Sequence, residues 1–572
     1  MEYSAIFHDM DKRFSYAVDK DLFVIRVQVK KDDMKEVILH YEDKYIPMER
    51  KDTRKTVPMK KVAVSQFHDY YEAQINMHLI CLRYFFEFTD TQGEKVYYGN
   101  YEFDKECITN RDRMFDCPQN LREEEMFEVP EWAANKVVYQ IFPSRFAATE
   151  PVDKELWYKA PITPMDDLHG NLRGIIEHMD DIQNLGIDVL YMTPIFQSNS
   201  CHKYDTTDYY QIDPSFGTTE DLKELVQKAH ERGMKVVLDA VYNHTGREFF
   251  AFADILENGE KSKYRDWYFI DGFPLKSEWG EIPNFKCFGY YGGMPKLNLK
   301  NPEVEKYITD VACYWIKECD IDGWRLDVGD EISHFFWKNF RKAVKAVKKD
   351  LLIIGEIWHY AGDFLEGDEW DTVMNYPFYL NLIDLLADEK ITVSQFVQNL
   401  GYLKGRLHKN CYPLMWNLID SHDTARFLHL CNDNKKKQHL AAAFQLLLPG
   451  MPMIYYGDEY AMPGANDPDC RRGMYWEEEY QDKEMYEWYK RLIQVRKSHA
   501  CIVEGELAGS VTEDEEGTIV LIRKNGEETI AMIFNCSSSA KKFNEYTQKY
   551  NLLTENTFDG NVEGFDAAVI VL

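Results

Sequence analysis

Apolar and polar positions alternate in short stretches over the first hundred residues of the chain. Examples are residues 22–29 (LFVIRVQV) and 81–88 (CLRYFFEF), with charged turns between such stretches. A period of two predicts β-strands with one buried face, and many short strands are typical of a β-sandwich. We therefore expect an N-terminal β-sandwich over residues 1–120, followed by a polar connector at residues 118–130 (PQNLREEEMFEVP).

The pattern changes after residue 136, where continuous apolar stretches alternate with amphipathic helical segments. Helical periodicity is clear at residues 172–185, 219–232 and 302–319. Eight candidate strands begin at Val137, Val189, Lys235, Gly323, Leu352, Val373, Leu414 and Met453. Strands that alternate with helices pair in parallel through right-handed crossovers, and eight of them close a barrel. The sequence thus predicts a (β/α)8 TIM barrel in a domain of residues 121–500.

Two further segments depart from the barrel pattern. The connection after His244 runs to about residue 301, which is too long for a structureless loop in a compact domain. We expect it to form an inserted subdomain B over residues 245–301. After residue 500 the alternation returns, and Asn525 with Gly526 gives a strong signal for a β-hairpin with a type I′ turn. A C-terminal β-sandwich over residues 501–572 therefore completes the predicted α/β architecture.

Charge and composition narrow the classes of partner. The formal net charge of −30 would repel phosphate backbones and anionic lipid surfaces, so we expect no nucleic-acid and no membrane partner. The opening residues (MEYSAIFHDM) do not resemble a secretory signal, and no apolar stretch is long enough to cross a bilayer. The 12 cysteines form no C-x-x-C pair, which argues against a zinc site. A cytoplasmic protein is the resulting expectation.

Three carboxylates stand where predicted barrel strands end: Asp327, Glu356 and Asp423. A TIM barrel presents its catalytic groups at this end of its strands. Arg325, two residues before Asp327, should lie on the same face of the strand and favour the ionised form of that carboxylate. Glu356 follows an apolar strand, where partial loss of water favours a proton donor. Taken singly, each carboxylate is explained as well by a helix cap or a surface ion pair.

Four segments in order resemble those of the α-amylase family of glycoside hydrolases. They are DAVYNH (239–244), GWRLDV (323–328), GEIWH (355–359) and IDSHD (419–423). MPKLN (294–298) and the segment HKYDTTDYYQIDPSFG from His202 are similar to the neopullulanase, cyclomaltodextrinase and maltogenic amylase subgroup, which also has an extra N-terminal β domain.

The resemblance implies roles for individual residues. Asp327 would be the nucleophile, Glu356 the general acid and base, and Asp423 the stabiliser of the transition state, with Arg325 orienting the nucleophile. The remaining substrate-binding candidates are His244, His422, Tyr204, Phe288, Trp358, Asp239 and Asn243. Among them Asp239 and Asn243 would chiefly hold the barrel together, and plain packing explains His244 and Phe288 equally well.

One loop departs from the family pattern. Many relatives place calcium ligands just after the first strand in a segment like FPDRFANGDP, whereas this chain has FPSRFAATEP at residues 142–151. Ser144, Ala147 and Ala148 supply few of the oxygens that calcium prefers. We expect no metal site and no required cofactor, with calcium at most weakly bound.

The resemblance therefore implies a retaining hydrolase of α-1,4 bonds in cyclodextrins, pullulan and maltooligosaccharides, with some transglycosylation and minor α-1,6 cleavage. It does not rank these substrates. The resemblance also implies a homodimer formed through the N-terminal domain. Two alternatives stay open: an α-glucosidase or oligo-1,6-glucosidase of the same family, and a non-catalytic sugar-binding homologue.

Overall fold

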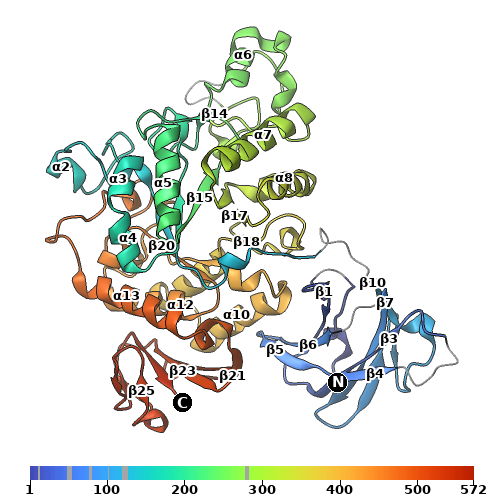
Figure 1. Cartoon of the computed structure of the whole chain (residues 1–572). Helices are drawn as coiled ribbons and strands as arrows, with labels where there is room; N and C mark the ends of the chain where they lie inside the picture. Colours follow the sequence, from blue (N-terminus) through green and yellow to red (C-terminus); the bar gives the residue numbers. More distant parts are fainter. Residues whose placement is uncertain (11–12, 48–53, 77–79, 101, 119–125, 277–281) are drawn as a thin grey trace. The chain divides into compact units, whose positions relative to one another are not determined.

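Two compact units make up the described part of the chain. The computed structural model describes all residues except 11–12, 48–53, 77–79, 101, 119–125 and 277–281 (Figure 1). One unit contains residues 1–129, 361–371 and 391–412, and the other contains residues 130–360, 372–390 and 413–572. Residues 119–125 of the expected connector lie outside the described residues.

The first unit contains a β-sandwich of two antiparallel sheets, as the alternation predicts. One sheet has the order β1 (Ser15–Ala17), β2 (Leu22–Lys30), β6 (His68–Asn76) and β5 (Lys60–Val64). The other has the order β4 (Lys55–Pro58), β3 (Met34–Asp43), β7 (Cys81–Asp90), β8 (Lys95–Tyr98) and β9 (Phe103–Asp104), and β10 (Phe115–Pro118) pairs with β7. Inward residues such as Val27, Leu39 and Phe86 are fully buried in the core between them. Their burial supplies the main driving force for this fold.

Helix α10 (Val393–Arg406) belongs to the same unit because its backbone approaches β5 and β6 closely. A Cβ atom on Gly401 would lie 1.9 Å from the carbonyl oxygen of Val64, and one on Gly405 would lie 2.4 Å from the Tyr70 ring. Only glycine fits at either position. The buried Arg26 guanidinium donates to the carbonyl oxygens of Gly405 and Leu407 at 2.8 and 2.9 Å, which satisfies the end of the helix.

The second unit contains the predicted barrel. Its parallel strands follow the order β18 (Thr372–Val373), β17 (Leu352–Gly355), β16 (Gly323–Leu326), β15 (Lys235–Ala240), β12 (Val189–Met192), β11 (Val138–Ile141), β20 (Met451–Tyr455) and β19 (Trp416–Asn417). A parallel bridge between Met374 and Trp416 joins the two ends of this order and closes the ring. The predicted (β/α)8 architecture is confirmed.

Helices surround these strands on the outside (Figure 1). They include α5 (Thr219–Glu231), α7 (Pro302–Cys319), α8 (His334–Val347), α12 (Lys435–Leu447) and α13 (Lys483–Ser498). The single helix expected at residues 172–185 is instead two, α3 (Leu172–Glu177) and α4 (Met179–Leu185). They part at His178, whose ψ of 11° departs from helical geometry.

Residues 245–301 form the expected insertion after β15. It contains α6 (Phe250–Asn258) and the short 3-10 turn η8 (Phe288–Tyr290), and isolated antiparallel bridges such as His244 with Lys296 tie its end back to its start. Among the residues that the structure describes, no helix is long and apolar enough to cross a membrane.

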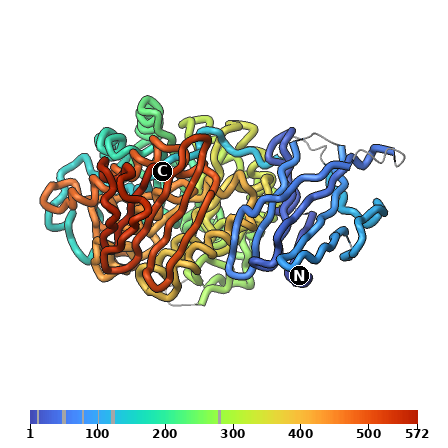
Figure 2. Tube along the Cα trace, turned by 90° about the horizontal axis from the view of Figure 1, so that it is seen from below, coloured from blue at the N-terminus to red at the C-terminus, as the bar shows by residue number. Residues whose placement is uncertain are grey.

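The C-terminal segment forms a six-stranded antiparallel sheet with a small second sheet beside it (Figure 2). The large sheet has the order β21 (Glu506–Glu513), β22 (Thr518–Asn525), β23 (Glu528–Asn535), β28 (Asp566–Val571), β25 (Tyr550–Asn551) and β26 (Asn556–Thr557), and the small one pairs β24 (Lys541–Lys542) with β27 (Asn561–Val562). The predicted hairpin joins β22 to β23, and Gly526 alone supplies a positive φ there (59°). The expected type I′ turn is wrong, because Asn525 pairs with Glu528 and the two central residues are Gly526 and Glu527, of which only Gly526 has the positive φ that type I′ requires of both.

Candidate active site

The barrel brings two of the predicted carboxylates together at neighbouring strand ends. Asp327 follows β16 and Glu356 follows β17, and these strands pair in parallel with Leu326 opposite Gly355. The backbone N–H of Glu356 donates to the carbonyl oxygen of Leu326 at 3.0 Å, which extends the ladder by one residue. Both side chains are buried. The register of the barrel therefore sets the two carboxyl groups side by side.

Arg325 lies at the centre of the charged groups. Its Nη1 contacts Asp327 Oδ1 at 2.8 Å and both carboxyl oxygens of Asp239 at 3.1 Å, and its Nη2 lies 2.9 Å from Glu356 Oε2. The side chain is fully buried, so these ion pairs form away from water. One rigid guanidinium thus fixes three carboxylates from three neighbouring strands. Of these contacts, the spacing of Arg325 and Asp327 along the chain predicts only the one with Asp327.

The carboxylates compete for ionisation within this cluster. Burial and the negative charge of Glu356 raise the pKa of Asp327 well above its usual range, against the opposing effect of Arg325. Burial likewise raises the pKa of Asp239 to about 6. The sequence predicts only the effect of Arg325 on the pKa of Asp327, because the proximity of Glu356 depends on how β16 and β17 pair in the barrel. The negative charge of Glu356 therefore opposes ionisation of Asp327, and the Arg325 guanidinium favours it.

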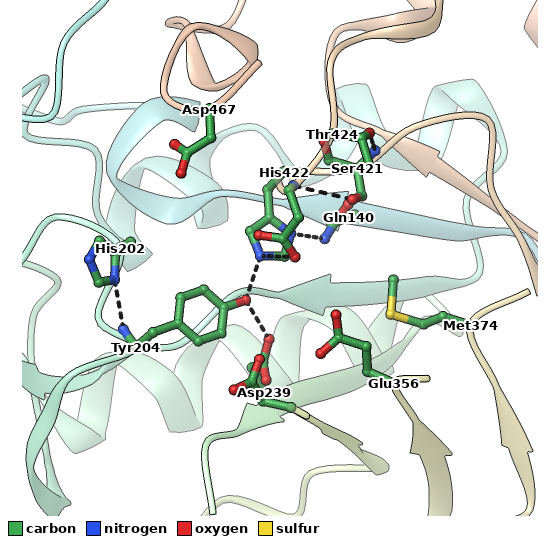
Figure 3. A network of polar contacts seen from close by, with 12 residues as sticks. Gln140, His202, Tyr204, Asp239, Glu356, Met374, Ser421, His422, Thr424 and Asp467 are labelled. Carbon is green, nitrogen blue, oxygen red and sulfur yellow. Dashed lines mark hydrogen bonds and ion pairs between the residues drawn. The ribbon is translucent and has the colours of Figure 1, made fainter. Parts of the chain in front are cut away.

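The Tyr204 hydroxyl points between His422 and Asp239 and joins them (Figure 3). The Tyr204 hydroxyl donates to Asp239 Oδ2 at 3.0 Å and lies 2.5 Å from His422 Nε2, while Nδ1 of that ring contacts the Gln140 amide at 2.8 Å. His422 Nε2 also lies 3.2 Å from Asp423 Oδ2. Burial lowers the pKa of His422 well below its usual range, so the ring is a neutral hydrogen-bonding group.

Asp423, the third predicted carboxylate, differs from the first two in being partly open to solvent. Its Oδ1 accepts from Arg471 at 3.3 Å, and the backbone N–H of Asp423 donates to Ser421 Oγ. The chain of contacts from Asp423 through His422, Tyr204 and Asp239 reaches Arg325. All three predicted catalytic carboxylates therefore lie in one connected cluster.

Three of the outer candidates, His244, Phe288 and Trp358, flank this cluster. His244 is uncharged at neutral pH, because burial lowers its pKa to about 3. Its Nε2 lies 3.1 Å from the carbonyl oxygen of Tyr204. The Phe288 ring stacks on His244, with 5.2 Å between ring centroids, so Phe288 lies next to the candidate site. Trp358 donates its indole N–H to Glu356 Oε1 at 3.1 Å.

Asn243 points elsewhere. Its amide donates to Glu331 Oε2 at 3.1 Å and its Oδ1 accepts from the ammonium of Lys296. Lys296 is the central residue of MPKLN, so this contact ties the end of subdomain B to the barrel. The geometry supports the architectural role expected of Asn243.

Several residues of the cluster have no signal in the sequence. Arg471 joins Asp423 to Asp467, with its Nη1 2.8 Å from Asp467 Oδ1, and both come from the loop after β20. Tyr191 donates to Asp239 Oδ2 at 2.7 Å, and the thioether of Met374 accepts from Arg325 Nε at 3.4 Å. Tyr191 lies in β12 and Met374 directly follows β18, and no motif distinguishes either of them from other barrel residues. Asp467 and Arg471 lie in the loop after the eighth strand, outside the four segments that resemble the family.

The loop after the first barrel strand offers a poor cage for calcium. Ser144 and Ala147 are buried, and the only carboxylate in FPSRFAATEP (residues 142–151) is that of Glu150. Over the residues that the structure describes, no group of three or more His, Cys, Asp or Glu side chains could hold a metal ion. Calcium prefers six to eight oxygen ligands with carboxylates among them, so this loop does not fit it.

Comparisons with known proteins agree with this geometry. Residues 140–485 match the family described as "Alpha amylase, catalytic domain", and residues 1–119 match "Alpha amylase, N-terminal ig-like domain". The chain is 42% identical to a cyclomaltodextrinase of Geobacillus thermopakistaniensis, with 94% of this chain and 92% of that protein covered. It is 39% identical to neopullulanase 2 of Thermoactinomyces vulgaris (93% and 90% covered) and 38% identical to an intracellular maltogenic amylase of Bacillus subtilis (94% and 91% covered).

A solved structure gives the same result for the fold. A cyclomaltodextrinase superposes over 100% of both chains with a TM-score of 0.94 and 37% sequence identity. The family model for the catalytic domain spans more than half of the chain, and the relatives align over nearly all of it. The chain belongs to the α-amylase family.

Proposed function

We propose that this enzyme hydrolyses α-1,4-glucosidic bonds in cyclodextrins, pullulan and maltooligosaccharides with retention of configuration. The observation that carries the proposal is the Arg325 guanidinium, which holds Asp327 and Glu356 on adjacent nitrogens. Carboxyl groups held this closely favour double displacement, for which a separation of about 5 to 5.5 Å is typical, over inversion, which needs room for a water between them. The names of the relatives support the substrate class.

In the first step Asp327 attacks the anomeric carbon while Glu356 gives its proton to the glycosidic oxygen, so the bond between that carbon and oxygen breaks. Asp423 and the neutral rings of His422 and His244 lie where they can bind hydroxyls of the same sugar and stabilise its positive charge. In the second step Glu356 takes a proton from water, which displaces Asp327. A sugar hydroxyl in place of water gives transglycosylation, and the same two steps at an α-1,6 bond give minor α-1,6 cleavage.

The products from each polymer test this function. We expect purified enzyme to release maltose from β-cyclodextrin and panose from pullulan, because an α-1,4 hydrolase leaves the α-1,6 bond of pullulan intact. Chromatography of timed digests measures both. Release of glucose alone from the ends of isomaltose and maltose would favour the α-glucosidase alternative, and no product from any α-glucan would favour the non-catalytic homologue.

We also propose that calcium is not required, since the loop at residues 142–151 has Ser144, Ala147 and Ala148 where many relatives place calcium ligands, and Glu150 is its only carboxylate. The expected result is that treatment with EDTA followed by desalting changes neither the melting temperature nor kcat on β-cyclodextrin. Calorimetric titration of the chelated enzyme with calcium should give no heat of binding in the micromolar range. A micromolar site that disappears on Ser144→Ala substitution would contradict this proposal.

A homodimer and a cytoplasmic location are the remaining parts of the proposal. A dimer through the N-terminal domain is supported by the family resemblance, and the name of the intracellular Bacillus subtilis relative supports the location. Sedimentation velocity at micromolar protein should give the mass of two chains, and deletion of residues 1–119 should leave a monomer. A single-chain mass for the intact protein would exclude the dimer.

A further inference from the structure

The indole of Trp358 contacts the carboxyl group that the proposed mechanism uses as acid and base. Its Nε1–H donates to Glu356 Oε1 at 3.1 Å. The other carboxyl oxygen, Oε2, accepts from the backbone N–H of Val328 at 3.0 Å and lies 2.9 Å from Arg325 Nη2. With Oε2 engaged by the Val328 backbone N–H and by the positive charge of Arg325, Oε1 is the oxygen left to exchange a proton with the substrate.

Trp358 itself is held in place on one side only. Its ring stacks on Tyr376, with 4.1 Å between centroids and 14° between planes, and Tyr376 is fully buried at the start of α9 (Tyr376–Leu382). The indole remains 43% exposed. One face of the ring is therefore fixed by protein, the other face is open to a sugar, and the polar edge points at the proton-transferring oxygen.

We propose that Trp358 is a positioning residue that aims Oε1 of Glu356 at the glycosidic oxygen, in addition to providing a surface for the acceptor sugar. This inference rests on the proposed role of Glu356. The indole N–H stabilises the ionised carboxylate that forms once the proton has left, and it restricts rotation of the carboxyl group before transfer. The same contact keeps Oε1 of Glu356 oriented toward the water or acceptor sugar from which it takes a proton in the second step.

Trp358→Phe separates the two roles, because phenylalanine keeps a ring that can stack on Tyr376 and lacks the N–H. On maltotriose, whose leaving group needs a proton, we expect kcat to fall about 10- to 100-fold with KM changed less than about threefold. On α-maltosyl fluoride, whose leaving group needs little protonation, kcat/KM should fall less than about threefold, because this ratio reports only the first step and not the base role of Glu356 in the second. Near-normal fluoride hydrolysis would also show that the variant is folded. Trp358→Leu should add a rise in KM for maltotriose, since it removes the surface as well.

Glu356→Gln is the reference, and it should lose activity on maltotriose far more than on the fluoride. Equal losses on both substrates in Trp358→Phe, or a rise in KM alone, would overturn the positioning role while leaving the role of Glu356 intact. If Glu356→Gln itself shows no dependence on the leaving group, the assignment of Glu356 fails and the inference fails with it.

Discussion

Asp327→Asn should reduce kcat on maltotriose by about 10⁴-fold or more while the protein stays folded. The amide has nearly the same shape as the carboxylate, so it can keep its place beside Arg325, but it cannot form the glycosyl ester. Burial and the charge of Glu356 already raise the pKa of Asp327, so replacing it by a neutral group relieves repulsion within the cluster. We therefore expect an unchanged or higher melting temperature. Steady-state kinetics and thermal unfolding measure the two effects.

Asp330→Asn is the matched control, because Asp330 lies only three residues further along and contacts none of the three predicted catalytic carboxylates in the contacts described above. Its kcat should stay within about threefold of the wild type, as is usual for a substitution outside the reacting groups. A second variant, Asp327→Gly, should regain turnover of maltosyl fluoride when azide is added and should yield the azide with inverted configuration. Undiminished activity of Asp327→Asn, or azide products from Asp330→Gly instead, would reject the nucleophile.

The sequence predicts the barrel well because its signal is local. Strands at Val189, Lys235, Gly323 and Leu352 begin at the residues where their apolar stretches begin, since a buried parallel strand needs apolar residues on both faces. The helix over residues 302–319 is also found as predicted, with Asn301 and Pro302 marking its start. Such features depend on neighbours along the chain.

The interactions within the site depend instead on register and were only partly predictable. Arg325 and Asp327 share a strand, so their contact follows from their spacing. The ion pair from Arg325 to Glu356 requires β16 and β17 to pair with Leu326 opposite Gly355, which no local pattern specifies. The contact between Arg471 and Asp423 likewise joins loops after two different strands. The sequence indicated which carboxylates matter, and the structure adds how their charges compete.

The split between α3 and α4 and the grouping of α10 with the β-sandwich illustrate the same limit. Helical periodicity continues through residues 172–185, so nothing in it marks the break at His178. Gly401 and Gly405 could be read as weak points of a helix, whereas their actual role is to let Val64 and Tyr70 approach. Close contacts between distant segments decide both cases.

Arg325→Lys should give the second-largest loss of activity, about 10²- to 10³-fold in kcat, because a lysine cannot occupy the several positions that the guanidinium fork fills. A single ammonium can approach Asp239, Asp327 or Glu356, but it lacks the planar arrangement that fixes all three. The distances from Arg325 to these groups are 2.8 to 3.1 Å, so a shift of one ångström in any carboxyl group disturbs the geometry of attack.

The pH dependence of Arg325→Lys distinguishes this role from simple loss of packing. Asp327 must be ionised to attack, so activity falls as the pH drops through the pKa that governs it. Arg325 is the interaction that lowers the pKa of Asp327 against burial and Glu356. Weakening that interaction raises the pKa of Asp327 further, so the acid limb of the kcat/KM profile should move to higher pH. Arg426→Lys is the control, since Arg426 is equally buried and bonds Asp458 at 2.9 Å outside this cluster. Arg426→Lys should lower the melting temperature without moving the acid limb of the profile. An equal displacement of the acid limb in both variants would show that Arg325 has no specific effect on the pKa of Asp327.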